Sequence, residues 1–174
     1  MNDYLKFYDL ERYLFDEVGP AFRSTGTIRP VDFYMVFIWK ANRAKNKLRN
    51  RLKTRAGSFA EAVEQIALLL HASNDQKERL RILMADWGLQ LPMASAILTV
   101  LYPNEFTVYD RRVCDELELK FRDWPPFSDA MWEEYRQFRE AVIAATPVNL
   151  SLRDKDRFLW GRSLRHDAER DCEV

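Results

Sequence analysis

The sequence predicts an all-α protein of about seven or eight helices, on three observations. Apolar residues recur at intervals of three and four through most of the chain, and no alternating strand pattern extends beyond a few residues. Capping and helix-breaking residues separate these runs. Hydrophobic residues make up 47% of the 174 residues, which is ample for a packed core. We expect one compact domain, or two small lobes that share a core.

The first half of the chain contains three predicted helical segments. Residues 3–18 carry apolar side chains at helical spacings, and Gly19-Pro20 is expected to end that run. Pro30 can begin a long helix that enters buried and continues as a basic stretch to residue 55. Ser58 opens a capping-box pattern that starts the third helix.

The second half of the chain adds five shorter segments. Asn74 or Asp75 can cap the first of them. Trp124-Pro125-Pro126 interrupts the chain between the third and the fourth, and the tail turns polar from Arg162. The expected helices cover residues 76–87, Pro92 to the loop at Pro103, 110–119, 128–145 and Ser151 to about 161.

The formal net charge of zero conceals a strong segregation of charge. Residues 40–55 hold eight Lys or Arg and no acidic residue. All 27 acidic residues, but only 19 of the 27 basic ones, therefore lie elsewhere. Charge runs are usually solvated helix faces, but eight positive residues repel one another and are tolerated best beside an anion.

The cysteines and the hydropathy pattern indicate where the protein works. Cys114 and Cys172 lie far apart, and the chain has neither a signal peptide nor an apolar run of 18 residues. We therefore expect a cytoplasmic monomer without membrane contact.

The stretch from Trp87 to Val113 is the most informative part of the chain. Gly88 follows a periodic apolar run, where a helix would stop in a left-handed cap. Pro92 then lies in the first turn of the next helix, where its missing N–H is harmless. Two helices joined by so few residues leave N–H groups that can bind one anion, such as a nucleic-acid phosphate.

This stretch resembles the helix-hairpin-helix superfamily of DNA glycosylases. Gly88-Leu89-Gln90 falls on the Gly-Val-Gly of that family's hairpin, and residues 94–98 fall on its Ala-rich helix. Asp110-Arg111-Arg112-Val113 falls on the signature that carries the catalytic aspartate. Residues 76–160 can be laid on the family less firmly. The resemblance implies a glycosylase-like bundle in which the basic helix 40–55 and the hairpin with its catalytic loop, 76–118, flank a cleft for DNA and a flipped base.

The chain also departs from the family's pattern. Gln90 replaces the second hairpin glycine, which affects how closely a phosphate can approach. Pro92 stands where bifunctional members carry a nucleophilic lysine, so no Schiff base can form there. Two cysteines are too few for the family's iron–sulfur cluster. No metal site or cofactor is expected, apart from a structural monovalent cation at the hairpin.

The resemblance makes Asp110 the candidate catalytic residue. Breaking a glycosidic C1′–N bond gives the sugar oxocarbenium character, and a fixed carboxylate can stabilise that charge and position a water molecule. The alternative is that Asp110 is an ordinary helix cap, since aspartate is among the best capping residues.

The other candidate site residues fall into two groups. Aromatic residues at helical spacing are mostly core, but base flipping requires aromatic walls, and Trp39 beside Lys40 is our preferred candidate. The remaining base-pocket candidates are Tyr34, Trp87 and Tyr109. The residues expected to contact DNA are Gly88, Leu89, Gln90, Ser95, Lys40, Arg43, Lys47, Arg51 and Arg111, of which Lys40, Arg43, Lys47 and Arg51 would share one helical face.

The sequence therefore predicts a monofunctional DNA glycosylase acting on double-stranded DNA that contains a modified base. The alternative is a non-catalytic helix-hairpin-helix DNA-binding module, which Gln90 and Pro92 favour. The base remains open at this point: oxidised, alkylated, deaminated or mismatched bases in repair, or hypermodified bases of phage DNA in defence.

Overall fold

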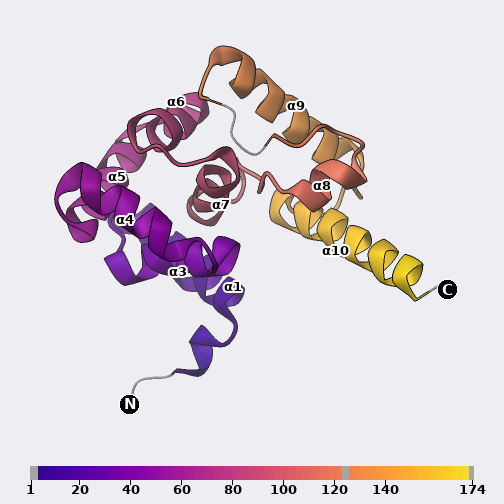
Figure 1. Cartoon of the computed structure of the whole chain (residues 1–174), viewed down its shortest axis with the longest axis horizontal. Helices are drawn as coiled ribbons and strands as arrows, with labels where there is room; N and C mark the ends of the chain where they lie inside the picture. The colour runs from indigo at the N-terminus through magenta and orange to yellow at the C-terminus, as the bar shows by residue number, and fades with distance from the viewer. Residues whose placement is uncertain (1–3, 123–125, 173–174) are drawn as a thin grey trace.

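A computed structural model describes residues 4–122 and 126–172. The all-α prediction is confirmed, because the described residues contain helices and no strand (Figure 1). Trp124 and Pro125 of the predicted break lie outside the described residues. Within the described residues, no helix is both long enough and apolar enough to cross a membrane.

The described helices form nine continuous runs, against the seven or eight predicted. A 3-10 turn, Leu5–Phe7, precedes them, and π-helical segments Leu14–Val18 and Ile82–Asp86 join α1 to α2 and extend α6. The α-helices are α1 (Leu10–Tyr13), α2 (Gly19–Thr25), α3 (Pro30–Ala41), α4 (Lys45–Ala56), α5 (Phe59–Ala72), α6 (Gln76–Arg81), α7 (Leu91–Leu101), α8 (Arg111–Glu116), α9 (Asp129–Ala144) and α10 (Leu152–Asp171).

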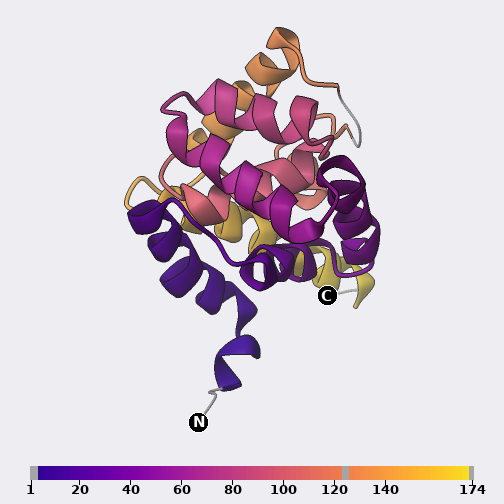
Figure 2. The ribbon, with the colours of Figure 1, turned by 90° about the vertical axis from the view of Figure 1, so that its left-hand side faces the viewer.

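The prediction that Gly19-Pro20 ends the first helix is wrong. The run continues to Thr25 because a π-helical turn, in which the Gly19 N–H bonds the Leu14 carbonyl, precedes Pro20. Pro20 then lies in the first turn of α2, directly after the π-helical turn. Gly19 is needed for packing, since a Cβ there would lie 2.3 Å from the Val100 carbonyl oxygen of α7. Figure 2 shows the N-terminal end of this run extending away from the bundle.

The long helix predicted from Pro30 to residue 55 is also wrong, and its break accounts for the ninth run. The chain turns at residues 42–44 between α3 and α4. α3 packs against both α7 and α5, whereas α4 packs mainly against α5 and buries Leu48 and Leu52. A straight helix could not satisfy both sets of contacts, so the basic stretch bends.

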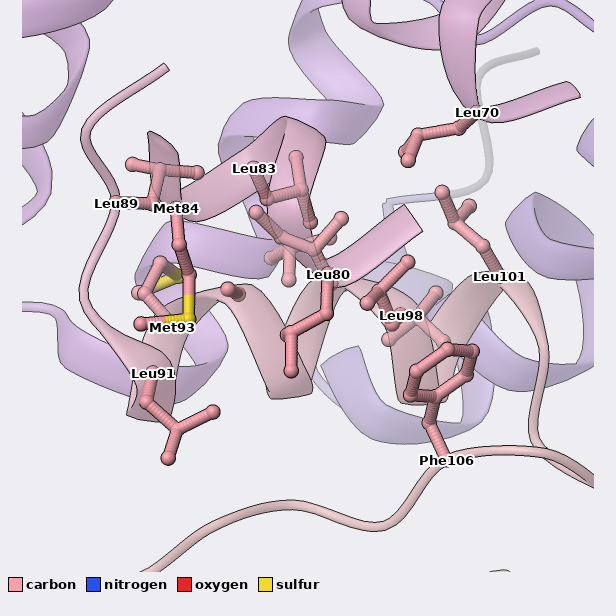
Figure 3. Packing of buried hydrophobic residues seen from close by; sticks show 14 of the residues in the cluster. Leu70, Leu80, Leu83, Met84, Leu89, Leu91, Met93, Leu98, Leu101 and Phe106 are labelled. Atoms are coloured by element: carbon pink, nitrogen blue, oxygen red, sulfur yellow. The ribbon is translucent and has the colours of Figure 1, made fainter. Parts of the chain in front are cut away.

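The predicted hairpin between α6 and α7 is confirmed as local structure. Gly88 has φ 67°, and the Leu89 N–H closes the end of the preceding helical run on the Leu83 carbonyl, at 2.9 Å. Pro92 lies in the first turn of α7. α7 occupies the centre of the bundle, with its residues Leu91 and Met93–Leu101 buried (Figures 1 and 3).

The C-terminal helix is longer than predicted. α10 runs to Asp171, past the polar change at Arg162, because ion pairs fasten its far end to α8. Arg162 pairs with Glu116, and Asp167 pairs with Arg112. α10 therefore packs along α8, and the two helices lie next to each other in the bundle (Figure 1).

Candidate functional site

A pocket of about 510 Å³ lies where α3, the start of α8 and α10 meet. It falls within the range of about 300–1,000 Å³ that is usual for small-molecule sites. Ten residues line it: Glu11, Trp39, Lys40, Val108, Asp110, Val113, Arg153, Asp156, Arg157 and Trp160.

Asp110 caps a helix and is also partly exposed to the pocket. One carboxylate oxygen accepts the Arg112 N–H at 3.0 Å and caps α8. The other forms an ion pair with the Lys40 ammonium, which reaches it from the last turn of α3. The two side chains are 22% and 15% exposed. The expected cap is therefore present, and the same carboxylate also lines the pocket.

Arg153 lies between two carboxylates and two aromatic rings. Its guanidinium pairs with Glu11 at 2.9 Å and with Asp156, and lies 5.2 Å from the ring centre of Trp39. Phe15 packs on the guanidinium at 4.8 Å. The Arg153 Nε is buried and has no acceptor among the residues that the structure describes.

Asp156 ties α10 to the loop that leads to Asp110. One of its oxygens accepts from the Thr107 hydroxyl and from the Val108 N–H, both at 3.1 Å. Burial raises the pKa of Asp156 to about 6, and the partly compensating influences are the charge of Arg153 and these two hydrogen bonds. The position of Asp110 therefore depends on a contact with the last helix.

The pocket is electrostatically balanced. It contains three carboxylates and three cations, and every carboxylate has a cationic partner. Asp110 pairs with Lys40, and Asp156 pairs with Arg153. Glu11 pairs with Arg153 and, at 3.1 Å, with Arg157.

The α10 contribution to the pocket was missed by the sequence analysis. Arg153, Asp156, Arg157 and Trp160 follow the i, i+3, i+4, i+7 spacing of one helical face. That spacing was visible in the sequence, but a mostly charged face is typical of a solvated helix. Trp160 is 43% exposed and lines the same pocket as the predicted Trp39, although the two residues lie far apart in the sequence.

Three predicted base-pocket residues do not line this pocket. The Tyr34 hydroxyl bonds Asn46 at 2.8 Å on another face of α3. Trp87 is 6% exposed within the core. Tyr109 precedes Asp110, but its ring stacks on Phe121 and lines a separate pocket of about 190 Å³.

The hairpin carbonyls are bound by arginines from α4. Arg51 donates to the Gly88 carbonyl at 2.6 Å, and Arg55 donates to the Asp86 carbonyl. A Cβ on Gly88 would lie 2.8 Å from the Arg55 guanidinium, so the arginine packs directly on the turn. These carbonyls do not fit the expected monovalent cation, because two guanidinium groups would repel it.

Two residues predicted to contact DNA at the hairpin have buried side chains. The Leu89 side chain is 2% exposed. Ser95 is fully buried, and its hydroxyl accepts the Tyr109 N–H at 2.9 Å. The Met93 N–H bonds the Gln90 carbonyl at 3.0 Å, and Pro92 has none to offer. Gly88 and Gln90 remain partly exposed.

The basic residues do not share one helical face as predicted, because of the break at residues 42–44. Lys40 points to Asp110 and Arg51 to the hairpin. Arg43 and Lys47 are exposed, in the turn and on α4 respectively. Arg111 is exposed at the start of α8, with its guanidinium 4.6 Å from the Phe121 ring.

Comparisons with protein-family models, with curated proteins and with solved structures find no match to this chain. The resemblance of residues 88–113 to the helix-hairpin-helix glycosylases therefore rests on the motif alone. A function has to be argued from the chemistry of the pocket.

Proposed function

We propose that this protein is a monofunctional DNA glycosylase that flips a modified base out of double-stranded DNA and hydrolyses its glycosidic bond. The observation that carries the proposal is Asp110, the residue matching the family's catalytic aspartate, in the wall of a pocket of ligand size. Capping α8 does not require the Asp110 carboxylate to line a pocket, so its place in the pocket wall supports a second role.

The proposed reaction uses the two partners of the ion pair differently. As the C1′–N bond breaks, positive charge develops on the sugar, and the Asp110 carboxylate stabilises it and orients the attacking water. The water contributes hydroxide to C1′, and a proton goes to the departing base. The Lys40 ammonium holds Asp110 in place, and in the proposal it is the positively charged donor that passes a proton to that leaving group.

The monofunctional assignment follows from the amines near the site. Pro92 occupies the hairpin position where a lysine nucleophile would be required. Lys40 does reach the pocket, but an ammonium engaged with a carboxylate has no lone pair with which to attack a sugar. Water is therefore the nucleophile in the proposal.

Duplex DNA would be held by exposed basic residues outside the pocket. α4 presents Lys47 to solvent, the preceding turn presents Arg43, and Arg111 is exposed at the start of α8. Such residues bind phosphates by charge without reading sequence. Recognition of the base would then depend on the pocket itself.

The second candidate is a DNA-binding module without catalysis. Pro92 and the Met93 hydrogen bond favour it, since they reduce the number of N–H groups available to a phosphate at the hairpin. The pocket favours the enzyme, because a binding module has no use for a cavity lined by a carboxylate and two indoles.

A base-release assay separates the two candidates. The protein is incubated with duplexes that carry single modified bases and with phage genomes, and abasic sites are then cleaved by alkali. If the protein is a glycosylase, at least one substrate should be cleaved by alkali only after incubation with the protein. Tight binding to all duplexes with no abasic site on any of them would favour the module and contradict the proposal.

A further inference from the structure

We propose that the base taken by the pocket is neutral, is larger than an unmodified base and carries oxygen atoms as hydrogen-bond acceptors. This inference deepens the proposed function and rests on it. It narrows the substrate to bases enlarged by an uncharged polar substituent, as opposed to cationic alkylated bases or small deaminated ones.

The acidic residues of the pocket are already neutralised. Every carboxylate that lines the pocket already has a cationic partner: Asp110 has Lys40, Asp156 has Arg153, and Glu11 has both Arg153 and Arg157. A cationic base would find no uncompensated negative charge and would face three cations. The paired pocket therefore offers a cationic base no net attraction to offset the loss of its hydration, and so favours a neutral base.

The two indole rings of the pocket also favour a neutral ligand. A cationic base is usually held over the open face of an aromatic side chain. The Trp39 ring already has the Arg153 guanidinium at 5.2 Å, and the Arg112 guanidinium lies 5.8 Å from the centre of the Trp160 ring. Both indoles therefore have a cation near their rings, and they offer apolar stacking surface to a neutral ligand.

The hydrogen-bond donors and the volume of the pocket favour a polar and enlarged ligand. Arg153 and Arg157 bring guanidinium groups to the pocket. Arg157 binds Glu11 through Nε and Asp154 through Nη1, which leaves its Nη2 N–H groups, unpaired among the described residues, to donate to a carbonyl or hydroxyl oxygen of a ligand. A volume of about 510 Å³ also exceeds what a single ring system fills, and leaves space for a substituent.

The proposal is tested by single-turnover base release from four duplexes that differ at one base. They carry uracil, the cationic 7-methylguanine, 5-hydroxymethylcytosine, or 5-hydroxymethylcytosine with glucose on its hydroxyl. We expect the enlarged glucosylated base to be released at least about tenfold faster than uracil or 7-methylguanine. Equal or faster release of uracil or 7-methylguanine would overturn the inference and leave the proposed glycosylase intact. Release from none of the four, nor from the wider panel, would remove the proposed function itself.

A variant that changes the charge of the pocket tests the preference for neutral bases separately from the preference for large ones. Arg157→Met leaves Glu11 with one cation and gives the pocket a net negative charge, so release of 7-methylguanine relative to neutral bases should rise about tenfold. Arg165→Met is the matched control, because Arg165 lies on the same helix, is 79% exposed and pairs with Glu169 away from the pocket. The same relative rate in wild type and Arg157→Met would contradict the electrostatic selection.

Discussion

The Lys40–Asp110 pair makes a prediction about stability that needs no substrate. Replacing Lys40 by Met keeps most of the length of the side chain and removes its charge, which leaves Asp110 without its ion-pair partner. Replacing Asp110 by Asn keeps a capping oxygen for the Arg112 N–H and removes the other half of the pair. The double variant loses both charges together.

The expected magnitude follows from the burial of the pair. An exposed pair is worth about 0–1 kcal/mol, whereas breaking a fully buried pair costs about 3–5 kcal/mol. At 15% and 22% exposed, Lys40 and Asp110 lie between these limits, so each single variant should lose about 1–3 kcal/mol. The coupling energy between the two substitutions should be about 1–2 kcal/mol.

Thermal and denaturant unfolding of the four proteins measures this cycle. A loss of 1 kcal/mol corresponds to a fall in Tm of about 2–4 °C for a chain of this size. The double variant should therefore melt well above the value expected if the two single losses added. Additive losses would refute the contact between α3 and the start of α8 from which the site is built.

Three further predictions concern binding, chemistry and pH. Neutralising the exposed Arg43 and Lys47 should weaken binding to all duplexes alike and lower the log–log salt slope by about 0.9 for each lost phosphate contact; an unchanged slope in filter-binding titrations would place them away from DNA. Borohydride should trap no covalent adduct with abasic DNA, and strand scission should require alkali; trapping that disappears in Lys40→Met would instead identify Lys40 as a nucleophile. Burial raises the pKa of Asp156 from 3.8 to about 6, so the native state binds the proton more tightly than the unfolded chain does, and the stability contributed by this group falls by up to about 3 kcal/mol as pH rises from about 4 to about 6. The difference in unfolding free energy between wild type and Asp156→Asn should follow that fall, and a difference that is constant with pH would contradict it.

Local signals in the sequence predicted local structure well. Ser58, Asp75 and Ser151 each cap the helix expected of them, with the side chain accepting a backbone N–H. Gly88 has the positive φ that its position required. These features depend on a few neighbouring residues, which is why a single sequence is sufficient to find them.

The errors came from contacts between distant segments. Gly19 reads as a helix breaker, but α7 requires a residue without a Cβ there. The segment from Pro30 to residue 55 reads as one helix, but of its two parts α3 packs mainly on α7 and α4 mainly on α5. Propensity and charge pattern do not contain this information, because tertiary packing overrides both.

The candidate site was predicted in part for the same reason. Asp110 and Trp39 were found through a motif and a position, and both line the pocket. The contact of Lys40 with Asp110 spans 70 residues, and no local signal indicates it. The α10 residues required knowing that this helix packs against α8, which only the fold supplies.

The central claim is that the Asp110 carboxylate supports base release. It is tested most directly by the single-turnover rate of Asp110→Asn on a confirmed substrate, beside Asp115→Asn, an exposed acid on the same helix. We expect Asp110→Asn to fold, to bind DNA at least as tightly as wild type, and to release the base at least about 100-fold more slowly, a loss of about 2.7 kcal/mol or more in barrier stabilisation. Asp115→Asn should keep the wild-type rate. Wild-type release by a folded Asp110→Asn variant would show that Asp110 is only a helix cap.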